Sequence, residues 1–82
     1  MHGDEVSLAL DEVHVRVTSP LIGKTLADSG IRQQSGAVIV AIKPLDGKLN
    51  SNPAPDTLLA VGDTLIALGT VQQLKDLDAL AR

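Results

Sequence analysis

The chain has 82 residues, of which 44% are hydrophobic, none is cysteine or aromatic, and its formal net charge is −3. This length predicts one domain with a core of Val, Ile, Leu and Ala, and it excludes disulfides and cysteine-based sites. The acidic balance and the lack of stacking aromatics argue against a nucleic-acid polymer as partner, and the longest apolar run, "AVIVAI", is too short to cross a bilayer.

The first periodic segment is "EVHVRV", which predicts a half-buried strand over residues 12–17. Val6, Leu8 and Leu10 alternate in the opposite phase, so we expect a turn or a bulge near Asp11 to absorb the change. His14 falls on the polar face, where we interpret it as a solvated side chain rather than a ligand. The apolar face of the strand is formed by three valines, Val13, Val15 and Val17.

A polar stretch separates this strand from the most hydrophobic run. "GKTLADSG" predicts a short helix over residues 23–30, with Gly30 in a left-handed cap position. "SGIRQQSG", residues 29–36, predicts a turn, in which Arg32 is either a solvated side chain or part of an anion-binding site. "AVIVAI", residues 37–42, is apolar on both faces and predicts a central strand.

Turn residues divide the next part of the chain into short strands. "PLDG" predicts a tight turn, and "KLNSNP", residues 48–53, predicts a short strand that its proline ends. "TLLAV" (57–61) and "TLIAL" (64–68) flank Gly62-Asp63, which predicts two strand segments around a tight turn with a positive φ at the glycine.

The apolar spacing in the last segment, "GTVQQLKDLDALAR", predicts a helix. Thr70 and Gln73 have the spacing of a capping box, in which each side chain bonds the backbone of the other. The residues expected largely on the outer face are Gln72, Lys75, Asp76 and Asp78. The inner face is predicted from four residues near helical spacing, Val71, Leu74, Leu77 and Leu80.

Two short motifs resemble functional loops but fail chemically. "GKT" resembles the end of a phosphate-binding P-loop, yet the leading glycine position is Thr18, and Pro20 lacks the amide that would cradle phosphate. "DGKLNSN" lacks the acids and the spacing of a calcium loop. No nucleophile and base share a recognisable arrangement, so we expect no enzyme activity and no metal site.

Three ordered segments resemble the C-terminal regulatory domain of RCK and TrkA proteins (RCK_C or TrkA-C): "LIGKTL", "IRQQSGAVIVAI" and "NPAPDTLLAVGDTLIALGTVQQL". The resemblance implies an α+β fold, with a small mixed or antiparallel β-sheet flanked by two helices, in a homodimer. It assigns residues 12–82 to the regulatory domain and residues 1–11 to an N-terminal linker or leading strand.

The resemblance also implies a role. Such domains are cytoplasmic regulatory modules of potassium channels and ion transporters, and they follow a Rossmann-like RCK N-terminal domain beside the parent membrane domain. Several bind a small effector at the dimer interface, cyclic di-AMP among them, without catalysis. No certain cofactor follows, but a cyclic dinucleotide or another anionic nucleotide is the expected effector. The alternative is a ligand-free dimerisation and assembly module.

By the same resemblance, Arg32 matches the arginine near bound cyclic di-AMP, where its planar fork suits phosphate. Gly30 and Val38 stand where those relatives tend to carry an acid and an asparagine, which weakens the case for cyclic di-AMP itself. The alternative reading of Arg32 is an ordinary surface or interface ion pair. The residues predicted to bind the ligand are Ile31, Arg32, Gly36, Val38, Asn52 and Pro53.

Overall fold

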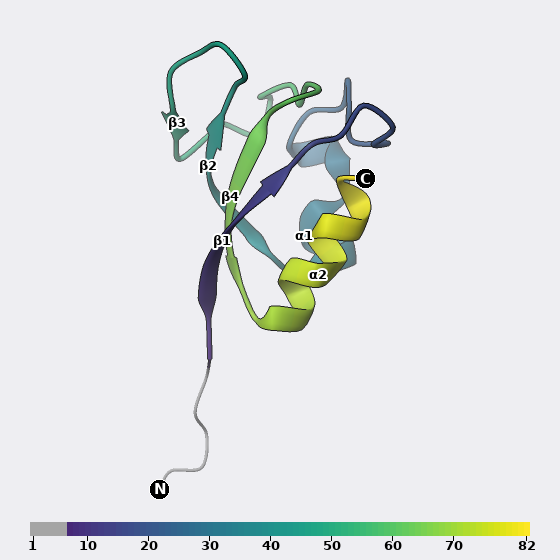
Figure 1. Ribbon diagram of the computed structural model, residues 1–82, viewed down its shortest axis with the longest axis vertical. Helices are drawn as coiled ribbons and strands as arrows, with labels where there is room; N and C mark the ends of the chain where they lie inside the picture. Colours follow the sequence, from purple (N-terminus) through teal and green to yellow (C-terminus); the bar gives the residue numbers. More distant parts are fainter. Residues whose placement is uncertain (1–6) are drawn as a thin grey trace, which may run out of the picture.

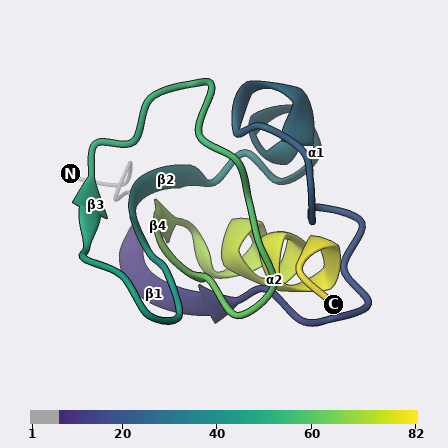
Figure 2. The ribbon, with the colours of Figure 1, turned by 90° about the horizontal axis from the view of Figure 1, so that it is seen from above.

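The computed structural model describes residues 7–82 and has the α+β fold that the sequence predicts. A four-stranded antiparallel sheet in the order β1-β4-β2-β3 carries both helices on one side (Figures 1 and 2). Helix α2 packs on β1 and β4, and α1 packs against α2. The elements are β1 (Ala9–His14), η1 (Ala27–Ser29, a 3₁₀ turn), α1 (Ile31–Ser35), β2 (Val38–Lys43), β3 (Asn50–Ser51), β4 (Thr64–Gly69) and α2 (Val71–Leu80).

The apolar core lies between the sheet and the helices and is built from Val, Leu, Ile and Ala side chains. Alternate residues of β4 point inward, so Leu65 and Ala67 are buried while Ile66 between them is partly exposed. Helix α2 covers them with Leu74 and Leu77. A fully buried leucine of this kind contributes about 1.5–3 kcal/mol relative to an exposed one, so this layer dominates the stability of the fold.

Strand β1 differs from its predicted form in two ways. It pairs with β4 in unbroken register from Ala9 to His14, so the turn or bulge expected near Asp11 is absent from it. The leucines at 8 and 10 need neither, because they lie on the outer face of the strand and are exposed, and Val6 lies outside the described residues. The strand also ends at His14, and Val17 lies beyond it with 78% of its surface exposed. The sheet's register shift occurs instead in β2, between Ile39 and Ala41.

The prediction of a helix over residues 23–30 is wrong, because only the 3₁₀ turn η1 forms there. Helix α1 lies instead in the segment predicted to be a turn. Gly30 is left-handed, with φ of 76°, as expected. Ser29 accounts for the position of α1. Its hydroxyl accepts a hydrogen bond from the amide of Ile31, the first residue of the helix. Burial of Ile31 then anchors that helix in the core.

The predicted strand over 57–61 is also wrong, since the structure has only an isolated bridge between Thr25 and Leu58. The amide of Leu59 bonds the carbonyl of Lys24, so this segment pairs with the loop before η1 rather than with β4. Gly62 has the expected positive φ, 85°, but its amide bonds Val15. The predicted strand over 48–53 shortens to β3.

Helix α2 confirms the capping box. The Gln73 amide donates to the Thr70 hydroxyl at 3.2 Å, and the Thr70 amide donates to the Gln73 side chain at 2.9 Å. Leu74 and Leu77 are buried as predicted and Leu80 partly so. The exception is Val71, which is exposed because it begins the first turn, before the helix faces the sheet.

Candidate functional site

A groove of about 410 Å³ lies between α1, the start of β2 and the segment after β3. It brings together four of the residues predicted to bind a ligand, from three separate parts of the chain: Ile31, Arg32, Val38 and Pro53. Because α1 directly precedes β2, and β3 pairs antiparallel with β2, the fold itself draws these parts to one place. The other lining residues are Leu26, Ala27, Gln33, Ile39 and Pro55.

Among residues 7–82, Arg32 is the one charged residue that lines this groove. It is exposed, and among residues 7–82 its side chain makes no hydrogen bond or ion pair with another residue. A guanidinium carries five N–H donors in a fixed plane and suits phosphate or carboxylate in a two-point contact. The charge is therefore free to meet an anion that enters the groove.

The remaining walls are largely apolar. Leu26 and Ile39 are partly buried against the core, and two prolines form the side opposite α1. Val38 is 40% exposed, whereas Ile31 is only 2% exposed, because it anchors α1 in the core. Ile31 can therefore offer little surface to a ring. This combination of flat apolar walls and one cation suits a ligand with a ring and an acidic group.

Gly36 and Asn52, the other two predicted site residues, do not line the groove. Gly36 ends α1 with φ of 80°, and a Cβ there would lie 2.8 Å from Nε2 of Gln73. Asn52 has φ of 53°, and its amide bonds the carbonyl of Val40 at 2.9 Å. Each residue thus has a backbone role in the structure, and the ligand role of all six residues stays a prediction.

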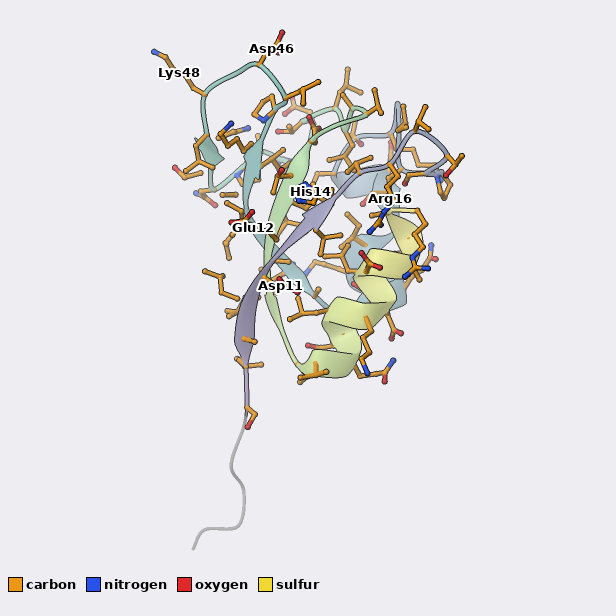
Figure 3. The ribbon with its side chains drawn as sticks, in the orientation of Figure 1. Asp11, Glu12, His14, Arg16, Asp46 and Lys48 are labelled. Atoms are coloured by element: carbon orange, nitrogen blue, oxygen red, sulfur yellow. The ribbon has the colours of Figure 1, made fainter. Side chains whose placement is uncertain are left out.

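A second groove of about 660 Å³ runs between β1 and α2 and contains charges of both signs. Asp78 there bonds Arg16 at 3.0 Å and Arg82 at 3.1 Å, and Figure 3 shows Arg16 beside the end of α2. The Arg16 hydrogen bond, with a smaller one from Arg82, lowers the pKa of Asp78, although partial burial acts in the opposite direction. Arg82 is already paired with Asp78, and the carboxylates of Asp11 and Glu12 also line this groove, so it suits an anion less well.

Other chemistry is sparse in the described part of the chain. Residues 7–82 contain no group of three or more His, Cys, Asp or Glu placed to hold a metal ion. His14 is exposed on β1, as expected, with Nδ1 3.0 Å from the Thr64 hydroxyl. Among the helices of this range, none has both the length and the apolar character needed to span a membrane.

Sequence reasoning missed five lining residues of the first groove, because it did not place a helix at 31–35. Gln33 and Ala27 come to the groove only through α1 and η1. A signal for α1 was present: "SGIRQQSG" has a glycine before and after a five-residue segment, the pattern of a short helix between two left-handed caps. Pro55 had a weaker signal, since it follows Pro53 by two residues.

Comparison with known proteins agrees with this fold. The chain is 47% identical over 57 residues to "Potassium channel protein 1" of Methanocaldococcus jannaschii, covering 70% of this chain and 17% of that protein. The chain thus spans about a fifth of the length of the curated potassium channel proteins it matches.

Two solved structures are similar over most of both chains. One is the RCK_C domain dimer of S. agalactiae BusR in complex with c-di-AMP, with a TM-score of 0.81, 29% identity and 89% of each chain covered. The other is the RCK C domain of the potassium transport protein KtrA with c-di-AMP, with a TM-score of 0.76, 29% identity and coverage of 88% and 81%. A longer BusR chain, solved with promoter DNA, matches over 38% of its length.

The TrkA-C domain family matches residues 10–82, which is nearly the whole chain and includes every element of the sheet and both helices except the first residue of β1. This match agrees with the three ordered motifs, the antiparallel sheet and the shared fold of the solved relatives. The chain therefore belongs to the TrkA-C domain family.

Proposed function

We propose that this domain is a dimeric cytoplasmic regulatory module of a potassium channel or ion transporter, and that its Arg32 groove binds an anionic nucleotide effector. The observation that carries the proposal is the unpaired Arg32 guanidinium at an apolar groove, formed where three parts of the chain meet. Nothing in this arrangement provides a nucleophile or a base, so the role is binding rather than catalysis.

The partners follow from the relatives. The curated matches are potassium channel proteins about five times longer than the matched segment, which supports a parent membrane domain and a Rossmann-like RCK N-terminal domain as neighbours. We do not expect a nucleic-acid polymer as a partner of this domain. It has 7 Lys and Arg against 10 Asp and Glu, and the DNA-bound relative is matched over only 38% of its length.

The chemical class of the effector is an aromatic ring joined to a phosphate. Two relatives were solved with c-di-AMP, which supports a cyclic dinucleotide. Val38 offers a methyl surface to a ring but no hydrogen bond to a base, so discrimination between bases is expected to be weak. A phosphate would bond Arg32, and the prolines would cover one face of the ring.

A second candidate function is a ligand-free dimerisation and assembly module. The burial of Ile31 favours it, because a side chain with 2% of its surface exposed cannot stack on a base. On this view Arg32 makes an ion pair with another chain of the complex.

Calorimetric titration with cyclic di-AMP, AMP and ATP separates the two. We expect wild type to bind at least one of them, and Arg32→Ala to bind it roughly 10–100-fold more weakly, the scale of a charge-assisted hydrogen bond of about 1.5–3 kcal/mol. Lys48→Ala is the matched control, because Lys48 lies on the β2–β3 loop (Figure 3) and does not line the groove. Equal affinity of wild type and Arg32→Ala, or no binding at all, leaves the assembly module.

A further inference from the structure

We propose that the open edge of strand β1, together with the groove between β1 and α2, docks an extended segment of a partner protein in which two basic residues precede two apolar ones. The segment adds to the sheet as a further strand. This surface is separate from the Arg32 groove, so the inference goes beyond the proposed function and does not depend on it.

The two edges of the sheet differ in length and protection. One edge is β3, which has two residues, Asn50 and Ser51, and is closely followed by Pro53. Short strands and prolines are common protection for a sheet edge. The other edge is β1, which has six residues, the first four of them exposed. A short extended peptide can therefore pair with β1 but not with β3.

The backbone groups of an edge strand face its neighbour and the open side in alternation. The amide of Val15 bonds the carbonyl of Asp63, which continues the pairing of β1 with β4. The amide of Arg16 bonds the carbonyl of Ala81, at the end of α2. The odd-numbered residues of β1 therefore bond β4, and the even-numbered ones face the open side, which the end of α2 closes at Arg16.

Three residues of β1 thus present backbone groups to the open side: Leu10, Glu12 and His14. The amide of Glu12 is occupied, because it donates to the Asp11 carboxylate at 2.8 Å. Within residues 7–82, the other amides and carbonyls of this set bond no loop, cap or side chain. These are the groups that a pairing strand uses, and a basic residue of the partner would draw the Asp11 carboxylate away from the one occupied donor.

The groove beside β1 runs along this open edge. Five consecutive residues of the strand, Ala9 to Val13, line it. Because successive side chains point to opposite faces of a strand, consecutive residues can line one groove only where the backbone edge forms part of the wall. The residues that form the α2 side are Val71, Leu74, Lys75, Asp78 and Arg82.

The order of side chains along this edge sets the chemistry of the partner. Ala9 and Leu10 come first and line the groove with Val71, and Leu10 and Val71 are 64% and 63% exposed. Asp11 and Glu12 follow, and neither forms an ion pair with another described residue. All strand pairs in this sheet are antiparallel. An added antiparallel strand therefore has basic residues opposite the two acids and then apolar residues opposite the two before them.

The remaining charges of the groove belong to α2. Asp78 bonds Arg82, and Lys75 lies on the helix rather than on the strand with which the segment pairs. A second copy of this chain is the rival occupant of the edge. It suits the edge less well, because two β1 strands paired about a two-fold axis would bring Asp11 and Glu12 against the same acids.

The first test uses the capped peptide Thr-Lys-Lys-Val-Val-Thr in an NMR titration of the isotope-labelled chain. We expect saturable shifts along β1 and slower solvent exchange of the Leu10 and His14 amides, with no change at Asn50 of β3. The charge-reversed peptide Thr-Glu-Glu-Val-Val-Thr should bind roughly 10-fold or more weakly, because like charges would then face each other.

Methylated peptides test the backbone pairing itself. The first valine lies opposite Leu10 and exchanges hydrogen bonds with it, whereas the second lies opposite Ala9 and turns its amide away. N-methylation of the first valine should abolish the shifts along β1, and N-methylation of the second should leave them. The same loss from both peptides would overturn strand addition.

A charge swap in the chain tests the acids. Asp11→Lys combined with Glu12→Lys should reverse the preference, so that the glutamate peptide binds more tightly than the lysine peptide. The control makes the same change of net charge outside both grooves, with Asp46→Lys, on the β2–β3 loop (Figure 3), and Asp56→Lys. It should retain the wild-type preference.

Three results of the titration of wild type would overturn the proposal. They are equal affinity for the two peptides, shifts confined to the Arg32 groove, and no shift with either peptide. Protection of the Leu10 amide before any peptide is added would also overturn it, because a second copy would then occupy the edge. None of these results bears on nucleotide binding at Arg32, so the proposed function is tested separately.

Discussion

Two regions of this domain satisfy the hydrogen-bonding groups of their backbone by different means. The β4–α2 unit, residues 64–80, uses a strand ladder and a capped helix whose apolar residues face each other. The segment from Val15 to Ala37 has one short helix and a 3₁₀ turn, and its chain is held at three places by serine hydroxyls. The first region depends on apolar packing and the second on individual hydrogen bonds.

Each of these three serines is buried and acts in the same way. Its hydroxyl donates to a backbone carbonyl at 2.6–2.7 Å and accepts the amide two residues later at 3.1–3.2 Å. The carbonyls belong to Leu80, Leu26 and Ile31 respectively, and the serines are Ser19, Ser29 and Ser35.

The difference shows how a chain this small builds a groove. A residue packed among leucines can lose a methylene and keep its neighbours, but a buried hydroxyl that bridges two backbone groups has no equivalent substitute. The Arg32 groove lies on the serine-held segment, since α1 sits between Ser29 and Ser35. Its shape therefore depends on a few polar contacts.

The largest effect is expected in the packed region. Leu77 is completely buried between α2 and the sheet, so Leu77→Ala should lower the free energy of unfolding by about 2–5 kcal/mol through lost transfer energy and the cavity left behind. Urea unfolding followed by circular dichroism measures it. Val71→Ala, at the exposed start of the same helix, should change little; equal losses in both variants would contradict the assigned inner face.

A smaller but more local effect is expected from Ser35→Ala. This change leaves the amide of Ala37 and the carbonyl of Ile31 without the hydroxyl between them, and an unsatisfied buried group costs about 1–3 kcal/mol. The same unfolding measurement applies, with the exposed Ser51→Ala as control. If the two alanine variants unfold at the same urea concentration, the serine bridges do not hold this region.

The smallest effect is expected from breaking the ion pair between Arg16 and Asp78, which links the two regions. Arg16→Ala should lower stability at pH 7 by about 0.2–1 kcal/mol, as for an exposed pair. Arg16 lowers the pKa of Asp78 below the usual aspartate value of 3.8, so the pair stabilises the fold above that pH. This contribution is lost as the pH falls through the folded-state pKa of Asp78.

Unfolding of wild type and Arg16→Ala across this acidic range checks the sign. The difference in the free energy of unfolding between the two proteins should become smaller below pH 3.8. Any difference between wild type and Lys48→Ala should not follow the titration of Asp78. A gap that widens toward low pH would show that Asp78 is not the partner of Arg16 in solution.

The fold could be predicted where periodicity and burial agree. The alternation of apolar residues is sufficient to predict β4, and the capping box with the apolar spacing after it is sufficient to predict α2, because one face of each element meets the same apolar core. The structure of residues 23–36 could not be predicted in this way. The start of α1 depends on the hydroxyl of Ser29 and on the burial of Ile31, and a five-residue helix is too short for either to leave a periodic pattern in the sequence.

The candidate site was predicted in part for the same reason. Val38 and Pro53 are brought together by antiparallel pairing of β2 with β3, which the turn residues indicate, and Arg32 comes to the same place because α1 directly precedes β2. The segment over 57–61 was misread as a strand since its apolar residues suit one, but the amide of Leu59 bonds the Lys24 carbonyl instead. A contact between distant loops cannot be read from local sequence.

Strand β1 has a further consequence for how the protein behaves at high concentration. It forms one edge of the sheet, and an open edge is a template on which other chains can add strands and aggregate. Here the Asp11 carboxylate accepts the amide of Glu12 at 2.8 Å. One edge donor is thus occupied, and two adjacent acidic side chains stand along this edge, which makes it a poorer template for strand addition by other copies of the chain.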